Sequence, residues 1–267
     1  MTTTSTPVRD TVSLARGIRR RAVGMVAPQG FGYLGQALSS AETVAALYGS
    51  YLRPGVDRFI CSPGHYIIAA YAAAAEVGLL SEEQLLTYGQ DGSELEAIGT
   101  ERTPLVDLTC GSLAQGLSGA AGFAYADRLL SRNEGRVYAL ISDGELEEGQ
   151  VWEAAMFAAH HRLGSLVVIL DANNSQVDGP VDSITTIEPI ADKWTAFGWH
   201  AVDVDGHDVD AVHAAFESAL KDERPSVIIA RTSTVHGLDV LPPDADGHFI
   251  KLPPELAAAA REELADA

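Results

Sequence analysis

The hydrophobic pattern of the chain predicts strands that alternate with helices. Short, continuous apolar runs occur near residues 57, 137, 166, 199 and 226, and each is long enough for a strand buried on both faces. Between these runs, apolar residues recur at helical spacing. This order predicts an α/β fold with a doubly wound, mostly parallel sheet and helices on both of its faces.

The pattern also places the individual elements. Besides the runs near 137 and 166, strands are predicted at Asp57–Cys61, 199–204 and Pro225–Arg231. Helices are predicted at 8–27, after Ser40, from His65, from Ser81 to about Tyr88, within 111–130, from Glu188 to Gly198 and at Val209–Leu220.

Glycine and proline mark the stretches between these elements. Residues 30–40 are expected to form a glycine-rich loop, after which Ser40 is expected to N-cap a helix with Thr43 at position N3. Residues 89–108 show no clear period and are expected to form an irregular loop. We expect residues 1–267 to form a single domain, with 234–267 as an irregular C-terminal extension that ends in an alanine-rich helix.

The stretch 137–180 holds the strongest candidate site. Asp143-Gly144 closes its first apolar run, and Asn173-Asn174 closes its second. In a parallel sheet both loops lie at the carboxyl edge, where α/β proteins bind ligands. A carboxylate, an amide oxygen and backbone carbonyls are hard donors. They suit Mg²⁺ or Ca²⁺, with further ligands from a phosphorylated cofactor.

Composition narrows the possible partners. With 37 acidic and 18 basic residues the net charge is -19, which argues against nucleic acid or an anionic membrane as a partner. No signal-peptide core and no long apolar span follows the polar start of the chain, so a soluble cytoplasmic protein is expected. Cys61 and Cys110 lie in apolar surroundings, where small buried residues are the expected interpretation rather than a disulfide or a nucleophile.

Residues 142–180 resemble the thiamine diphosphate motif of transketolases, and especially of their separate N-terminal subunits. Asp143 and Asn173 keep the spacing of that motif, whereas Ser142 replaces its first glycine. The similarity extends from about residue 9 to 232. Its other blocks are DRFICSPGHYIIAAYAAAAEVG, LTCGSLAQGLS and IEPIADKWTAFGWHAVDVDGHD.

The resemblance implies a site for thiamine diphosphate and Mg²⁺ (or Ca²⁺). The implied metal ligands are side-chain oxygens of Asp143 and Asn173 and the backbone carbonyl of Ser175. The implied cofactor-binding residues are His65, Gly111, Ser112, Leu113, Asp143, Gly144, Asn173 and Val177. Among them, Gly144 would offer its N–H to a phosphate oxygen, and Val177 would pack against the cofactor rings.

Simpler structural interpretations stay open for these residues. Asp143 and Asn173 could cap helices or turns, and His65 could cap a helix start. Glu148 matches a family glutamate near the subunit interface, whereas Glu145 and Glu147 are expected to be solvated. His160 and His161 are expected to be structural.

Two family histidines are absent from the sequence. Tyr33 stands where transketolases have one of them, and Glu96-Ala97-Ile98 aligns with the block that holds the other. His65, His248 and His236 are therefore the catalytic candidates, the last two as replacements from the C-terminal loop. Tyrosine donates a hydrogen bond but does not shuttle protons near neutral pH as imidazole does.

The resemblance also implies a partner chain. Complete transketolases carry a second domain with the pyrimidine-binding site and the activating glutamate, which are not found in this sequence. We therefore expect a separate C-terminal subunit, an α₂β₂ assembly and a small-molecule substrate, without nucleic acid or membrane.

The implied activity is transfer of a two-carbon ketol unit from a ketose or 2-oxo donor to an aldehyde-type acceptor. The alternatives are a 2-oxo-acid decarboxylase or acyloin-forming subunit of specialised metabolism, and a non-catalytic regulatory paralogue.

Overall fold

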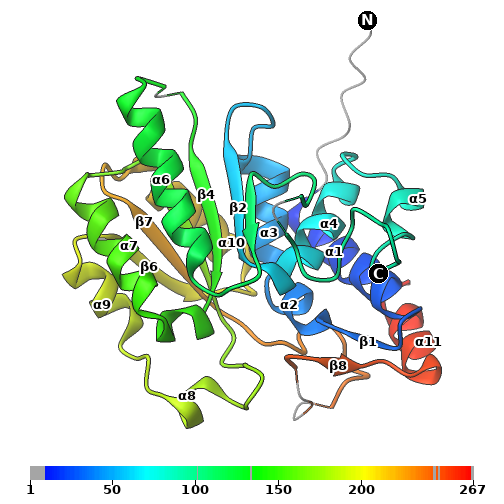
Figure 1. The fold of residues 1–267 in the computed structure, drawn as a ribbon. Helices are drawn as coiled ribbons and strands as arrows, with labels where there is room; N and C mark the ends of the chain where they lie inside the picture. The colour runs from blue at the N-terminus through cyan, green and yellow to red at the C-terminus, as the bar shows by residue number, and fades with distance from the viewer. Residues whose placement is uncertain (1–9, 101, 133, 243–244, 246, 266–267) are drawn as a thin grey trace, which may run out of the picture.

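A six-stranded parallel sheet forms the centre of the structure, a computed structural model that describes residues 10–100, 102–132, 134–242, 245 and 247–265 (Figure 1). The strands lie in the order β3-β2-β4-β5-β7-β6, and every neighbouring pair is parallel. Their bounds are β2 Arg58–Pro63, β3 Leu108–Cys110, β4 Val137–Ser142, β5 Leu166–Ala172, β6 His200–Asp205 and β7 Ser226–Arg231.

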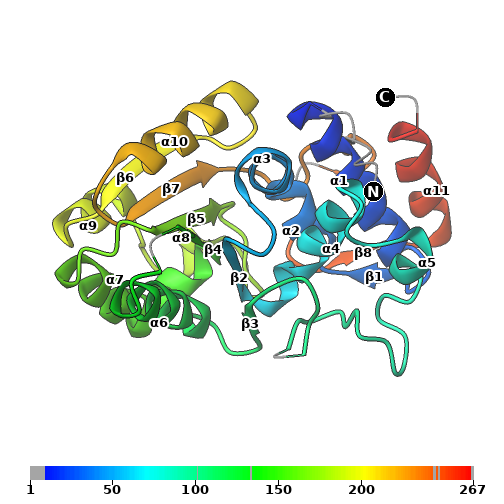
Figure 2. The same ribbon diagram turned by 90° about the horizontal axis from the view of Figure 1, so that it is seen from above.

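Helices cover both faces of this sheet. In Figure 2, α6 and α7 run along one face, and α3 and α10 lie on the other. The helices are α1 Thr11–Val26, α2 Leu34–Ser39, α3 Ala41–Ala46, α4 Ile67–Glu76, α5 Glu82–Leu85, α6 Gln115–Leu129, α7 Gly149–His160, α8 Val181–Ile184, α9 Ile190–Ala196, α10 Val209–Lys221 and α11 Pro254–Glu263. The predicted doubly wound α/β fold is confirmed.

The two faces of the sheet bury separate apolar cores. Along β4, Tyr138 and Leu140 join the core beneath α1, α3, α4 and α10, whereas Ala139 and Ile141 join the core beneath α6, α7 and α9. Successive side chains of a strand point to opposite faces, so a strand between two helical layers must be apolar at every position. This is why continuous apolar runs, rather than alternating ones, mark these strands in the sequence.

A two-stranded antiparallel ribbon joins the beginning of the chain to its end. Its strands are β1 (Phe31–Gly32) and β8 (Ile250–Lys251). Beside it, Gly35 lies against Gly247, where a Cβ on Gly35 would come within 1.8 Å of the Gly247 carbonyl oxygen. Only glycine allows this approach. The ribbon and the glycine contact fix the segment around His248 beside α2.

The prediction of a loop at 30–40 is wrong in part, because this stretch contains β1 and α2. The glycines suggested a loop, but Leu34 and Leu38 are fully buried, and tertiary packing makes this segment helical. Ser40 precedes α3 as expected, yet it does not cap that helix. Its hydroxyl donates to the Gln36 carbonyl at 2.6 Å, because α2 ends directly before it.

Three further predictions concern the stretch 89–108, the C-terminal extension and the domain organisation. The irregular stretch 89–108 leads into β3, a short strand that the pattern missed. The C-terminal extension contains β8 before the expected helix α11. The single-domain organisation of 1–267 stays a prediction. Across the described ranges, no helix combines the length and apolarity needed to cross a membrane.

Candidate functional site

The candidate site lies where β4 and β5 end side by side. Ser142 and Asp171 are register partners, and the Asp143 N–H donates to the Asp171 carbonyl at 3.2 Å. Asp143 therefore leaves the sheet directly beside Asn173. The sequence prediction that both polar loops meet at this edge is confirmed by the register.

The Asp143 carboxylate is held by backbone donors. Its Oδ1 accepts from the Gly144 N–H at 2.9 Å, and its Oδ2 accepts from the Asn174 N–H at 2.6 Å. The side chain is buried, and this burial, together with the nearby Asp171 carboxylate, raises the pKa of Asp143 to about 7. A cation at this position would offset the cost of burying the charge.

Asp171 fixes the orientation of Asn173. Its Oδ2 accepts from the Asn173 amide at 2.8 Å, the Tyr66 hydroxyl at 2.9 Å and the Ser39 hydroxyl at 2.5 Å. Its Oδ1 accepts from the Thr232 hydroxyl at 2.5 Å. Because the Asn173 amide nitrogen is committed to this buried carboxylate, the amide oxygen is the atom turned to the loop, where it accepts from Ser175 N–H.

The residues around Asp143 fit a divalent cation. A carboxylate, a side-chain amide oxygen and backbone carbonyls form the hard-oxygen set that Mg²⁺ and Ca²⁺ prefer. The edge is also hollowed here. A cavity of about 170 Å³ is lined by Asp143, Asn174 and Arg231, among others. The Gly144 N–H is not available to a phosphate in this conformation, since it donates to Asp143.

Glu145 is fully buried, which contradicts the expectation that it is solvated. Its Oε1 accepts from the Ser62 hydroxyl at 2.6 Å and the Ala114 N–H at 2.7 Å, and its Oε2 accepts from the Ser142 N–H at 3.0 Å. These three donors replace the water that a carboxylate loses on burial. Glu147 is exposed, as expected.

The turn Gly111-Ser112-Leu113 is exposed at the start of α6. It ends at Ala114, whose φ of +67° lies in the left-handed region. The N–H of this strained residue donates to the Glu145 carboxylate. The carboxylate therefore anchors the turn to the loop that carries Asp143.

His65, His248 and Tyr33 form one cluster of rings. The His65 centroid lies 5.1 Å from that of His248 and 5.1 Å from that of Tyr33, and Tyr33 lies 5.8 Å from His248. The Gln36 amide donates to the His248 carbonyl at 3.0 Å and contacts its Nδ1 at 3.2 Å. Burial, and then the neighbouring His248, lower the pKa of His65 to about 3, so its imidazole is neutral.

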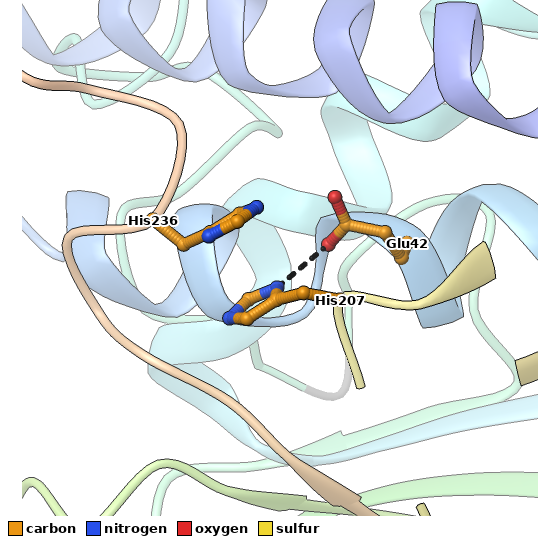
Figure 3. Close-up of side chains that lie close together, drawn as sticks. All are labelled: Glu42, His207 and His236. Carbon is orange, nitrogen blue, oxygen red and sulfur yellow. Dashed lines mark hydrogen bonds and ion pairs between the residues drawn. The ribbon is translucent and has the colours of Figure 1, made fainter. Parts of the chain in front are cut away.

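Other candidates lie outside this cluster. His236 stacks on His207, and the centroids of the two rings lie 3.6 Å apart (Figure 3). Val177 lies in the short turn after Asn173 and is 75% exposed, so it has an apolar surface to cover a ligand or a partner. The roles of these residues in cofactor binding and catalysis stay predictions.

The remaining candidates from the sequence are His160, His161 and the two cysteines, and the histidines make packing contacts as expected. His161 packs against Tyr125 and Phe157 on the α6–α7 surface, and His160 contacts His161. Both cysteines are free, and Cys61 is buried, but Cys110 is only half-buried.

Sequence reasoning missed the supporting residues of the site, chiefly Asp171 and Glu145. Asp171 ends an apolar run two residues before Asn173, a position that signals the carboxyl edge of a sheet. Glu145 gave no comparable signal, because its acidic neighbours suggest a solvated surface. Ser39, Tyr66 and Thr232 become recognisable only when the fold brings them to Asp171.

Comparison with known proteins identifies related chains. Residues 11–264 match the family described as "Transketolase, thiamine diphosphate binding domain". The chain is 41% identical over 254 residues to an uncharacterized transketolase family protein of Sinorhizobium fredii, covering 90% of each chain. It is 38% identical over 260 residues to 6-deoxy-6-sulfo-D-fructose transketolase subunit SqwG of a Clostridium species, covering 94% of each.

Solved transketolases share the fold but are longer. The enzyme from Campylobacter jejuni superposes with a TM-score of 0.86 at 27% identity, and the match covers 96% of this chain and 42% of that one. The enzyme from Leishmania mexicana gives a TM-score of 0.87 at 26% identity, covering 96% and 41%. The chain thus spans about two fifths of these solved transketolases.

Proposed function

Since the chain belongs to the transketolase family and carries its thiamine diphosphate-binding domain, we propose that it is the N-terminal subunit of a two-chain transketolase-like enzyme. The enzyme transfers a two-carbon ketol unit from a ketose or 2-oxo donor to an aldehyde-type acceptor. The observation that carries this proposal is the paired loop edge, where Asp143 and Asn173 meet within the family match.

In this proposal the chain holds the diphosphate end of the cofactor. Asp143, the Asn173 amide oxygen and the Ser175 carbonyl bind Mg²⁺ or Ca²⁺, which neutralises the buried Asp143 carboxylate. The turn Gly111–Leu113 takes other contacts to the cofactor, and Gly144 joins them only when its N–H turns from Asp143 to a phosphate oxygen. Bound thiamine diphosphate supplies the carbon nucleophile for cleavage next to a carbonyl, and the protein supplies orientation.

The ring cluster forms the substrate side. His65 is neutral because its pKa is low, so it can accept or donate one hydrogen bond without carrying charge. His248 is held beside it by Gln36. Tyr33 contacts both rings and can donate through its hydroxyl. This arrangement suits binding the hydroxyl groups of a sugar-like donor.

The two-chain assembly is supported by exposed surface and by one relative. Gly111, Ser112, Leu113 and Val177 are all exposed, which suits residues that a cofactor and a second subunit cover. The relative from Clostridium is named as a subunit and matches over 94% of each chain. We propose a C-terminal subunit that carries the pyrimidine-binding domain and the activating glutamate, in an α₂β₂ assembly.

The test is co-expression with the product of the adjacent open reading frame. The complex should transfer a ketol unit to an aldehyde acceptor only when thiamine diphosphate and Mg²⁺ are present. Donors should include fructose 6-phosphate, xylulose 5-phosphate and 6-deoxy-6-sulfo-D-fructose, the last because the relative from Clostridium is named for this sugar. Pyruvate serves as a further donor that reports decarboxylation.

The outcomes separate the alternatives. Tight cofactor binding without transfer from any ketose would contradict the ketol-transfer activity and leave the cofactor assignment. Consumption of pyruvate with release of carbon dioxide would favour the decarboxylase alternative. If the complex binds no thiamine diphosphate with Mg²⁺, the enzyme assignment is wrong.

A further inference from the structure

A polar cluster joins four segments that are far apart in the sequence, with Arg19 and Glu42 buried, His207 partly buried and His236 exposed. Arg19 of α1 pairs with Glu42 of α3, with N–O distances of 2.7 and 2.8 Å. His207, which follows β6, lies 3.1 Å from the same carboxylate through Nδ1. His236, from the segment after β7, stacks on the His207 ring with an interplanar angle of 12° (Figure 3). The function described above uses neither Glu42 nor His207.

A metal site is the first alternative for this cluster. Ligand atoms of Glu42, His207 and His236 all lie within 4.8 Å of one another. However, both nitrogens of His207 are already used, because the Ser233 N–H donates to Nε2 at 2.9 Å. Nδ1 therefore carries the proton that bonds to Glu42. A metal on Nδ1 would move that proton to Nε2, where it would face the Ser233 N–H.

Charge also argues against a metal ion here. The Arg19 guanidinium already neutralises Glu42, and both side chains are buried. A divalent cation bound to Glu42 would lie beside this fixed positive charge and would be repelled by it. The hydrogen bonds instead link Glu42 through His207 to the backbone of Ser233. This pair of hydrogen bonds is called the tether.

The tethered segment reaches both halves of the candidate site. On one side of Ser233, the Thr232 hydroxyl donates to Asp171, the carboxylate that orients Asn173. On the other side, Thr234 is buried against Gly247. A Cβ added to Gly247 would come within 1.7 Å of the Thr234 Oγ1. Gly247 precedes His248. One backbone position therefore sits between the metal-binding loop and the ring cluster.

We propose that Glu42 and His207 are positioning residues that fix Ser233, and through it both Asn173 and His248. This inference rests on the proposed function for what the two ends bind, but the tether itself is a property of the apo chain. The Nδ1–H tautomer of His207 is required, since only that form donates to Glu42 while accepting from Ser233. Neither residue touches the reacting atoms.

Two substitutions of His207 separate shape from hydrogen bonding. His207→Phe keeps a ring to stack on His236 but removes both hydrogen bonds. His207→Gln restores them, because its amide can donate to Glu42 and its oxygen can accept from Ser233. His213→Phe is the matched control, since both ring nitrogens of His213 are also hydrogen-bonded, to the hydroxyls of Thr11 and Tyr51, but His213 lies in α10 and not in this segment.

Hydrogen exchange of the full chain tests the tether without any ligand. His207→Phe should speed exchange in 232–237 by about 10-fold or more, and in 171–176 and 247–250 by a smaller factor, since the partly buried Ser233 N–H loses its acceptor. His207→Gln should exchange nearly as wild type, and His213→Phe should leave all three segments unchanged. Wild-type exchange rates in His207→Phe would overturn the proposal.

Binding of Mn²⁺ with thiamine diphosphate, followed by electron paramagnetic resonance, tests the positioning. With the partner subunit present, His207→Phe should weaken binding by about 10- to 100-fold, as supporting residues of metal ligands do, and His207→Gln should restore most of it. Equal weakening by His207→Phe and His213→Phe would overturn the proposal. If the wild type itself does not bind, the proposed function fails, and hydrogen exchange still decides the tether.

Imidazole ¹⁵N shifts of the wild-type chain give a test that needs no variant. They should show the Nδ1–H tautomer of His207, and the Nε2–H tautomer would contradict the tether. Zinc titration by calorimetry tests the metal alternative directly. Stoichiometric Zn²⁺ binding that His236→Ala abolishes would replace the tether with a metal site, whereas absence of binding supports the tether.

Discussion

The Oε1 atom of Glu145 lies 2.7 Å from the backbone nitrogen of Ala114 and accepts its hydrogen bond. This contact joins two loops that are 31 residues apart, one carrying Asp143 and the other carrying Gly111–Leu113. Both loops belong to the proposed cofactor site. The relative position of the two loops is therefore fixed by one buried carboxylate rather than by the strands alone.

Removal of this carboxylate should destabilise the fold. Glu145→Ala leaves the donors of Ser62, Ala114 and Ser142 without their acceptor, and we expect a loss of about 3–5 kcal/mol in the free energy of unfolding. Glu145→Gln should lower the free energy of unfolding by about 1–3 kcal/mol, because the NH₂ group that replaces one oxygen is a donor and faces an N–H. Urea denaturation measures both. Glu147→Ala, at an exposed neighbour, should change stability by less than about 0.5 kcal/mol.

Asp143→Ala should abolish Mg²⁺-dependent binding of thiamine diphosphate. The variant loses the charged member of the proposed ligand set, so we expect the dissociation constant in the proposed two-subunit complex to rise by more than about 100-fold. Calorimetric titration with and without Mg²⁺ measures it. Glu147→Ala again serves as the control, and unchanged affinity in Asp143→Ala would place the metal elsewhere.

His65 should make the chain acid-sensitive. Its pKa is about 3 in the folded chain against 6.5 for the free side chain, so the unfolded state binds the extra proton between these values. The stabilisation is complete above pH 6.5 and is lost progressively as the pH falls toward 3. Within this window His65 should contribute up to about 1.4 kcal/mol per pH unit to the slope of the unfolding free energy.

The His65 contribution is measured by urea denaturation between pH 7 and pH 4. His65→Gln should flatten the slope by up to this amount, whereas His160→Gln, at an exposed histidine, should leave it unchanged. Identical slopes for the wild type and His65→Gln would show that His65 titrates normally in the folded chain.

Gly35→Ala should open the contact between α2 and the His248 segment. Its Cβ would come within 1.8 Å of the Gly247 carbonyl oxygen, so the backbone must move, and we expect a loss of about 2–4 kcal/mol in stability. Gly122→Ala in α6 is the matched control, because nothing lies within 4 Å of its Cβ. That change should stabilise the chain by about 0.5–1 kcal/mol. Thermal denaturation compares the two variants.

The sequence was sufficient where one physical signal dominated. The strands were recognisable because burial on both faces demands continuous apolar runs, as in β4 and β5. Asp143 and Asn173 were recognisable because polar residues directly after such runs lie at the carboxyl edge. Both signals are local, and they do not depend on how the rest of the chain folds.

Features that depend on distant contacts were not predictable. Helix α2 contains Gly35 and follows Gly30 and Gly32, so local propensity favours a loop, yet burial of Leu34 and Leu38 makes it helical. Strand β3 has only three residues and little pattern of its own. Glu145 looked solvated because its acceptor role depends on Ser62, which lies 83 residues earlier.

The β1–β8 ribbon has a consequence for the order in which the site forms during translation. Phe31 pairs with Lys251, so the contact that fixes the His248 segment spans most of the chain. Strands β2 to β7 can pair before β8 has left the exit tunnel of the ribosome, but the ring cluster cannot close until β8 is outside it. The sheet edge that carries Asp143 and Asn173 therefore forms before the ring cluster, so a partner subunit that recognises the completed ring cluster would bind only chains synthesised beyond β8.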